Sequence, residues 1–237
     1  MSEIVNISSD FSFSYSGNQP LLKTIDELCL DQGSIYGIYG DNGSGKTTLL
    51  NILNTMLCPT TGSIRYSFNG LEYQFGPSSA KLMPELIANN IRRSFQVPFL
   101  IDEWTVSQNI LLSKRDYPQE QSSKVFSLFD KTDDELLFQL LDIGGFTGQE
   151  LAEDLSYGQR RLVSNLQMLY CRASLTILDE PFANIHTDVI KSLQAKYREF
   201  VRQDNATIII VEHKRNVIEQ FAHKIISTKN KELRFEN

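Results

Sequence analysis

The segment Gly40–Thr47 constrains the fold of this 237-residue chain more than any other part of its sequence. It reads Gly-Asp-Asn-Gly-Ser-Gly-Lys-Thr and matches the pattern G-x-x-x-x-G-K-[S/T]. The short apolar run 34–39 before it is typical of a buried strand, and the leucines after it are spaced as on a helix. A strand that turns directly into a helix in this way predicts an α/β fold with parallel strands.

The same segment predicts binding of a polyphosphate. Glycines at 40, 43 and 45 let backbone amides approach phosphate oxygens, and the helix that follows adds its positive end. Lys46 brings a full positive charge, and the Thr47 hydroxyl can bind Mg²⁺. A glycine-rich turn without a ligand is the alternative, which the lysine, the two threonines and both flanking elements disfavour. The residues predicted to bind nucleotide here are Gly40, Asp41, Asn42, Gly43, Ser44, Gly45, Lys46, Thr47 and Thr48.

A second apolar strand, 175–178, is followed by two carboxylates, Asp179 and Glu180. An aspartate at a strand end that faces a phosphate loop can hold Mg²⁺, and the next carboxylate can orient an attacking water. Two solvated acids at a strand end are the alternative, which the phosphate loop upstream disfavours. The sequence therefore predicts a phosphate site with the chemistry for hydrolysis.

Strand and helix patterns alternate through the last third of the chain, and this predicts crossover helices between parallel strands. Weaker alternation predicts strands near 11–15 and 25–30 and edge strands within 62–75. The region from about 77 to 153 has helical patterns instead, so we expect an α/β core with a helical insert. The predicted elements of the last third are helix 158–172, strand 175–178, helix 188–202, strand 206–211 and helix 215–222.

The segment Leu155–Gln159, Leu-Ser-Tyr-Gly-Gln, resembles the signature motif of ATP-binding-cassette (ABC) ATPases, usually written LSGGQ. Alone it would be read as a helix cap followed by a turn. Together with the phosphate loop (Walker A) and Asp179 (Walker B), it makes the chain resemble this family over nearly its whole length. The resemblance implies a single ABC ATPase domain over 1–237. Its P-loop NTPase core has a mainly parallel sheet and an N-terminal antiparallel β part, formed by 1–76 and 156–237, and its helical subdomain covers 77–155.

The resemblance also implies roles for residues outside the phosphate loop. Gln96 corresponds to the glutamine of the Q-loop, which joins Thr47 and Asp179 around Mg²⁺. His213 corresponds to the switch histidine, and with Glu180 and Lys46 it forms the implied catalytic set.

Tyr15 corresponds to the aromatic residue that stacks on adenine in this family. On a strand with a two-residue alternation, a tyrosine is otherwise a core or edge residue.

A head-to-tail dimer of two ABC ATPase chains, identical or not, follows from the same resemblance. In this family Ser156, Gly158 and Gln159 of one chain cover the ATP held by the other. The implied cofactors are ATP and Mg²⁺. Two departures from the family pattern are visible. His186 stands where the D-loop has an aspartate, unless Asp188 takes that role, and this loop communicates between the two ATP sites in the family. Tyr157 replaces the first signature glycine, which is a milder departure.

The apolar segment after Gln96 predicts where a partner protein binds. In transporters of this family the corresponding region receives a membrane-spanning subunit, so we expect docking near Val97, Phe99, Leu100 and Trp104. At least two of the four side chains Phe99, Leu100, Ile101 and Trp104 are expected to be exposed. The predicted function is the ATP-hydrolysing subunit of a membrane transporter, with some similarity to branched-chain amino-acid importers. A soluble ABC ATPase of the iron–sulfur cluster assembly type is the alternative.

Composition excludes other classes of protein. The formal net charge of −6 argues against general attraction to nucleic acid, so no nucleic-acid partner is expected. No apolar run reaches the ~18–20 residues of a membrane span, and no secretory signal is visible. Three widely spaced cysteines fit neither a disulfide framework nor a metal site. We expect a cytoplasmic chain that is held at the inner face of the membrane by partner subunits.

Overall fold

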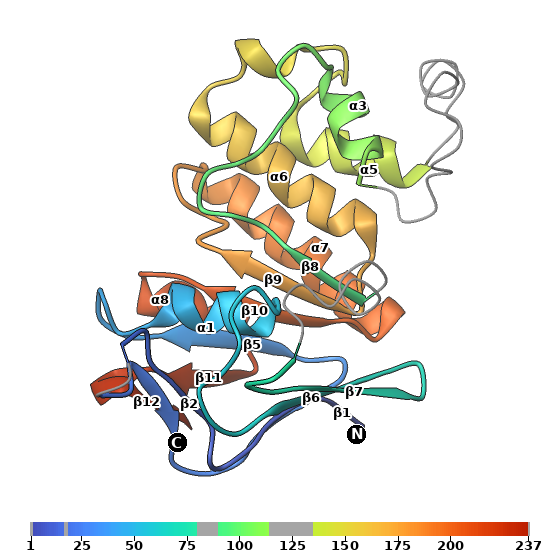
Figure 1. Cartoon of the computed structure of the whole chain (residues 1–237). Helices are drawn as coiled ribbons and strands as arrows, with labels where there is room; N and C mark the ends of the chain where they lie inside the picture. Colours follow the sequence, from blue (N-terminus) through green and yellow to red (C-terminus); the bar gives the residue numbers. More distant parts are fainter. Residues whose placement is uncertain (1, 17–18, 80–89, 114–134, 237) are drawn as a thin grey trace. The chain divides into compact units, whose positions relative to one another are not determined.

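The computed structural model of the chain describes residues 2–16, 19–79, 90–113 and 135–236 (Figure 1). The described chain divides into two compact units. The core unit comprises Met1–Arg93, Ala173–Glu180 and Phe200–Asn237, and the helical unit comprises Ser94–Arg172 and Pro181–Glu199. The inserted helical subdomain at 77–155 stays a prediction, and its residues 80–89 and 114–134 lie outside the described residues.

The larger sheet of the core unit is mostly parallel, as predicted. Among the described residues its strand order is β2-β3-β12-β11-β5-β10-β9-β8, and the run from β11 to β8 is parallel throughout. The carboxyl ends of β5 and β9 therefore lie at the same edge of the sheet. The bounds are β2 Ser12–Phe13, β3 Leu22–Thr24, β5 Ile35–Tyr39, β8 Ile91–Arg93, β9 Leu175–Asp179, β10 Thr207–Val211, β11 Lys224–Ser227 and β12 Glu232–Phe235.

A smaller antiparallel sheet, in the order β4-β1-β6-β7, confirms the predicted N-terminal β part. The turn between β6 and β7 is Asn69-Gly70, where both residues have positive φ angles (52° and 79°), as a tight hairpin requires. The strand predicted at 25–30 begins later, at Leu28, because residues 25–27 connect the short strands β3 and β4 without being part of either. The bounds are β1 Glu3–Ile7, β4 Leu28–Asp31, β6 Ile64–Phe68 and β7 Leu71–Phe75.

Helices cover the parallel strands, which explains why β9 and β10 are buried at every position. Helix α1 (Lys46–Leu53) contacts β9, and helix α8 (Arg215–Phe221) contacts β5. A Cβ atom at Gly37 of β5 would come within 2.1 Å of Ile218, so the close approach of α8 requires glycine there. The helix predicted after the phosphate loop is present as α1 but is short: it ends at Leu53, and Thr55 has a positive φ.

The helical unit is built around helix α6 (Tyr157–Cys171), which contacts α3 (Val106–Leu111) and α5 (Glu135–Gly144). The first part of helix α7 (Thr187–Asp204) also belongs to this unit. A buried polar network joins α7 to α6, because the Tyr197 hydroxyl donates to Asn165 Oδ1 (2.9 Å). The Asn165 amide donates in turn to the carbonyl oxygen of Pro181 (2.8 Å). Among the described helices, none is long and apolar enough to cross a bilayer.

The core unit should lose stability when a central strand is truncated. Ile209 of β10 is fully buried in the hydrophobic core, and its replacement by alanine leaves a cavity between sheet and helix. We expect Ile209→Ala to lower the free energy of unfolding by about 2–5 kcal/mol in urea denaturation. The control Leu71→Ala, on an exposed side chain of β7, should change it by less than about 0.5 kcal/mol. Equal effects of the two variants would contradict the described core.

Candidate functional site

The phosphate loop lies between β5 and α1, at the carboxyl edge of the parallel strands. Gly43 and Gly45 have φ angles of 76° and 95°, which side chains other than glycine resist. A Cβ atom at Gly45 would also meet the side chain of Leu22 at 2.7 Å. The glycines therefore allow the backbone to turn sharply into the N-terminus of α1, where an anion is favoured.

Lys46 lies within this loop and donates to two of its own carbonyl oxygens. Its Nζ atom is 2.8 Å from the oxygen of Gly40 and 2.9 Å from that of Asp41. Burial lowers the pKa of Lys46, while the charges of Glu180, Asp41 and Asp179 act in the opposite direction. The two strand-end carboxylates are thus close enough to act on the lysine, as the sequence predicted for a single site.

A buried threonine that sequence reasoning missed packs against the phosphate loop. Thr228, which follows β11, is fully buried, and its hydroxyl lies 2.5 Å from the hydroxyl of Ser44. Its amide donates to the carbonyl oxygen of Tyr39 (2.9 Å), at the end of β5. A Cβ atom at Gly40 would come within 2.1 Å of the same hydroxyl, so the loop rests directly on this residue. No motif marks Thr228 in the sequence.

Asp179 at the end of β9 is buried and forms an ion pair with Arg93 of β8. The Arg93 Nη2 atom lies 3.2 Å from Asp179 Oδ2, and both side chains are about 95% buried or more. Arg93 Nη1 donates to Asn51 Oδ1 on α1, one helical turn after Thr47. Burial lowers the pKa of Arg93, and Asp179 opposes this effect. Sequence reasoning missed Arg93, because the short strand 91–93 carries no pattern of its own.

Glu180 and His213 are brought together by two neighbouring parallel strands. Glu180 follows β9 and His213 follows β10, and His213 Nε2 lies 2.7 Å from Glu180 Oε1. The Glu180 amide donates to the carbonyl oxygen of Val211 (2.9 Å), and its φ angle of 51° turns the chain out of the strand. The pair predicted from separate motifs is therefore in direct contact at the sheet edge.

Tyr15 lies beside the first turn of α1, with its ring 68% exposed. Its hydroxyl is 3.3 Å from the hydroxyl of Thr48, and its ring packs edge-on against Phe13 with centroids 4.8 Å apart. Asp41, Asn42 and Thr47 of the phosphate loop are exposed as well. An exposed aromatic face beside the loop is free to stack on a planar ligand.

The signature residues of the helical unit cap α6 and face solvent. Ser156 and Gln159 form a reciprocal capping box, with Ser156 Oγ 2.8 Å from Gln159 Oε1, and both are exposed. A Cβ atom at Gly158 would meet the carbonyl oxygen of Asn184 at 2.3 Å, so only glycine allows the backbone at Asn184 to lie this close to the first turn of α6. His186, two residues further on, is exposed, with Nδ1 3.9 Å from a carboxylate oxygen of Asp188.

Gln96 also belongs to the helical unit, where its backbone is held by α6. The Tyr157 hydroxyl donates to the Gln96 carbonyl oxygen (3.0 Å), and Arg161 Nη2 donates to the same oxygen. Arg161 is buried, donates to the Tyr157 hydroxyl (2.7 Å) and also reaches the Phe95 carbonyl oxygen (3.4 Å). Sequence reasoning missed Arg161, although its position four residues after Tyr157 places both on one helix face. The place of Gln96 beside a metal stays a prediction.

The expected docking segment is only partly exposed. Val97 and Phe99 are 71% and 82% exposed, but Leu100 is 6% exposed, so its predicted place on the surface is wrong. From Val97 to Leu100 exposed and buried residues alternate, so Leu100 turns inward. Ile101 and Trp104 are half-buried, so only one of the four named side chains is fully exposed, where at least two were expected.

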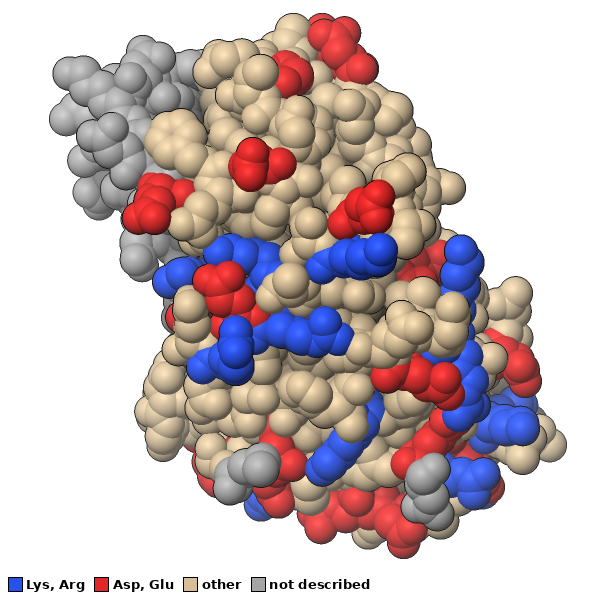
Figure 2. Space-filling view, turned by 180° about the vertical axis from the view of Figure 1, so that it is seen from behind, with Lys and Arg blue, Asp and Glu red and all other residues tan. Residues whose placement is uncertain are grey.

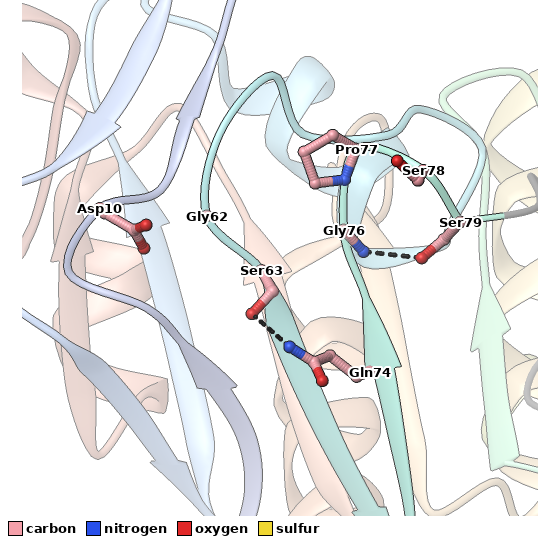
Figure 3. A pocket seen from close by; sticks show the side chains of 8 residues that line it. All are labelled: Asp10, Gly62, Ser63, Gln74, Gly76, Pro77, Ser78 and Ser79. Atoms are coloured by element: carbon pink, nitrogen blue, oxygen red, sulfur yellow. Dashed lines mark hydrogen bonds between the residues drawn. The ribbon is translucent and has the colours of Figure 1, made fainter.

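A polar hollow of about 560 Å³ lies elsewhere in the core unit (Figure 3). The Gly76 amide donates to Ser79 Oγ (2.8 Å), and Gln74 Nε2 donates to Ser63 Oγ (3.2 Å) at its wall. None of the predicted site residues lines this hollow, so it is not part of the predicted site. Its lining residues are Asp10, Gly62, Ser63, Gln74, Gly76, Pro77, Ser78 and Ser79.

Comparison with known proteins identifies similar chains. The family model described as "ABC transporter" matches residues 24–183. The energy-coupling factor transporter ATP-binding protein EcfA2 of Staphylococcus epidermidis is 28% identical over 203 residues, which cover 84% of this chain and 66% of EcfA2. The nucleoside import ATP-binding protein NupA of Lactococcus lactis is 30% identical over 200 residues, which cover 84% of this chain and 37% of NupA. The chain thus spans less than two thirds of either relative.

A solved structure supports the fold. The dimeric structure of the ATP-binding cassette MJ0796 in a post-hydrolysis state, bound to ADP and phosphate, superimposes with a TM-score of 0.74 at 20% identity. The match covers 99% of this chain and 98% of MJ0796. At this level of identity the similarity concerns the fold.

Loss of the Arg161 guanidinium should loosen the segment around Gln96. We expect Arg161→Met to lower the free energy of unfolding by about 1–3 kcal/mol, because the partly buried carbonyl oxygens of Phe95 and Gln96 each lose a charged donor. Hydrogen exchange of the amides in 94–98 should become faster. Tyr157→Phe, which removes one hydroxyl, should have a smaller effect on both measurements. Unchanged exchange in Arg161→Met would contradict the described contacts.

Proposed function

The chain belongs to the ABC transporter family, and we propose that it is the ATP-hydrolysing subunit of an importer whose membrane-spanning parts are separate chains. The observation that carries the proposal is the gathering of Lys46, Glu180 and His213 in one unit, at the ends of adjacent parallel strands. These groups supply a cation for the phosphates and a carboxylate for water, which are the parts that phosphoryl transfer to water needs.

ATP binds with its phosphates at the phosphate loop and its adenine on Tyr15. The amides of the loop and the start of α1 donate to the phosphate oxygens, and Lys46 moves from the carbonyls of Gly40 and Asp41 to the outer phosphates. The exposed ring of Tyr15 beside Thr48 supports the adenine position. The remaining nucleotide-binding residues of the loop are those predicted from the sequence.

Mg²⁺ fits the oxygen donors at this sheet edge. Thr47 offers an exposed hydroxyl on the first turn of α1, and Asp179 offers a carboxylate whose charge also acts on Lys46. The family resemblance implies that Gln96 would be a third ligand. When bound, the metal neutralises charge on the phosphates, and this is the chemistry that it adds.

Glu180 orients the attacking water, and His213 holds Glu180. The contact of 2.7 Å between the two side chains supports this arrangement. Water adds to the γ-phosphorus as the bond to the ADP oxygen breaks, Glu180 accepts a proton of the water, and ADP and phosphate are the products. Lys46 stabilises the negative charge on the transferred group.

Two chains close on each nucleotide, with the signature residues of one chain over the phosphates of the other. Ser156 and Gln159 are exposed at the N-terminus of a 15-residue helix, which suits contact with an anion on a neighbouring chain. The dimeric cassette MJ0796 supports this mode of association.

A membrane-spanning subunit docks at the exposed side chains Val97 and Phe99, with Trp104 at the margin. Phe99 is the most exposed large apolar side chain among the described residues. Import is supported by NupA, and the relatives EcfA2 and NupA are named for transport other than of branched-chain amino acids. The net charge of −6, and the interspersed acidic and basic side chains in Figure 2, support a protein partner over nucleic acid.

Lys46→Ala should remove ATP binding from the phosphate loop. The variant loses a charge-assisted hydrogen bond worth about 1.5–3 kcal/mol, so affinity for ATP should fall by at least about tenfold in calorimetry. Lys23→Ala, which removes a surface lysine paired with Glu232, is the control and should bind as the unmodified chain does. An ATP affinity in Lys46→Ala equal to that of the unmodified chain would contradict the assignment of the loop.

Glu180→Gln should separate binding from hydrolysis. The amide keeps the shape of the side chain but cannot accept a proton, so phosphate release should fall by about 10²-fold or more while ATP affinity stays within about threefold. Sedimentation should show an ATP-dependent dimer that persists. Glu72→Gln, on the surface of β7, should hydrolyse ATP normally. Normal turnover in Glu180→Gln would remove Glu180 from the mechanism.

A further inference from the structure

The register of two parallel strands explains how Arg93 reaches Asp179. Arg93 of β8 lies opposite Ile177 of β9, and Asp179 follows Ile177 by two residues. Residues two apart on a strand share one face of the sheet, so the long arginine side chain extends along that face to the carboxylate. Arg92 alternates to the other face, and its side chain is half-buried instead.

The ion pair is enclosed between the sheet and α1. Arg93 reaches across to Asn51 on α1, while its other terminal nitrogen lies 3.2 Å from Asp179 Oδ2. A carboxylate buried to this degree needs a cation or several donors, because its hydration is lost. In the structure described here, Arg93 meets this need on the same carboxylate that the proposed function gives to Mg²⁺.

We propose that Arg93 competes with Mg²⁺ for the Asp179 carboxylate, so that the metal binds only together with the phosphates of the nucleotide. The inference rests on the proposed function, because it takes Asp179 as a ligand of Mg²⁺. Mg²⁺ without nucleotide would approach a carboxylate that is already neutralised, next to Lys46 and Arg93, two cations of the same sign. The phosphates bring the negative charge that offsets both cations.

Arg93 on this account acts through Asp179 and touches neither the nucleotide nor the water. It keeps the buried carboxylate in place while the site is empty, with Asn51 holding the guanidinium from the helix side. It also opposes the approach of Mg²⁺ to Asp179 as long as no phosphates offset its charge. Removal of its charge should therefore make Mg²⁺ bind more tightly, whereas loss of a purely structural residue would weaken all binding.

The test compares the affinity for a fluorescent, non-hydrolysable ATP analogue in Mg²⁺ and in EDTA. The ratio of the two affinities measures how strongly the metal and the nucleotide support each other's binding. Because Mg²⁺ could then bind Asp179 without the nucleotide, we expect Arg93→Met to bind Mg²⁺ alone about tenfold more tightly, a change equivalent to ~1.4 kcal/mol, and to lower this ratio below that of the unmodified chain. Arg93→Lys keeps the positive charge and should restore a ratio close to that of the unmodified chain.

Arg92→Met is the matched control, because it removes the same charge from the adjacent position on the other face. An equal change in Arg92→Met, or an Arg93→Met that binds Mg²⁺ alone no more tightly or keeps the ratio unchanged, would overturn the inference. If Mg²⁺ enhances binding to the unmodified chain but Arg93→Met leaves the ratio unchanged, only this inference fails. If Mg²⁺ has no effect on the unmodified chain, the metal role of Asp179 in the proposed function fails with it.

A second measurement needs no destabilising variant. Side-chain NMR of isotope-labelled arginine follows the guanidinium of Arg93 in the unmodified protein, with its signal assigned by its loss in Arg93→Lys. Addition of Mg²⁺ to the nucleotide complex should shift this signal, because Asp179 is then shared with the metal. A signal that is the same in EDTA and in Mg²⁺ would overturn the proposed competition.

Discussion

A lysine ammonium enclosed by the backbone of its own loop is the interaction on which the core unit depends. Lys46 is buried between two carbonyl oxygens and is exposed to the charges of the strand-end carboxylates. Such a cation needs negative or dipolar partners on several sides, because water is largely excluded. That enclosure is formed by the glycines of the loop, by the carboxyl ends of β5 and β9, and by Thr228, whose hydroxyl contacts that of Ser44. In the proposed function, an arriving polyphosphate would replace partners that are already arranged around the charge.

Charge balance connects the site with the elements around it. Asp179 is neutralised by Arg93 from β8, and Glu180 contacts His213 from the end of β10. Each partner comes from a strand adjacent to β9, so the order of the parallel strands selects which side chains can meet. In the helical unit the charge of Arg161 is instead paired with backbone groups, because its guanidinium donates to the carbonyl oxygens of Phe95 and Gln96. The function proposed for the chain depends on these pairings more than on any single motif.

Motifs and periodicity predicted the larger part of this arrangement. The turn from β5 into α1, the helix of the signature motif and the contact between Glu180 and His213 followed from local sequence patterns and the family resemblance. Contacts that depend on register could not be predicted, because Arg93 lies on a three-residue strand and meets Asp179 only across β8 and β9. Leu100 was placed wrongly for a related reason: an apolar run does not tell which alternate side chains turn inward. Sequence patterns predict elements better than they predict pairs of elements.

A crystal structure of the chain with Mg²⁺ and a non-hydrolysable ATP analogue would test the central claim most directly. The account predicts phosphate oxygens within hydrogen-bond distance of the amides of Gly43–Thr47. It also predicts that the Lys46 ammonium has left the carbonyls of Gly40 and Asp41 for the phosphates. A nucleotide bound elsewhere, or a Lys46 that keeps both carbonyl contacts beside a bound triphosphate, would contradict it.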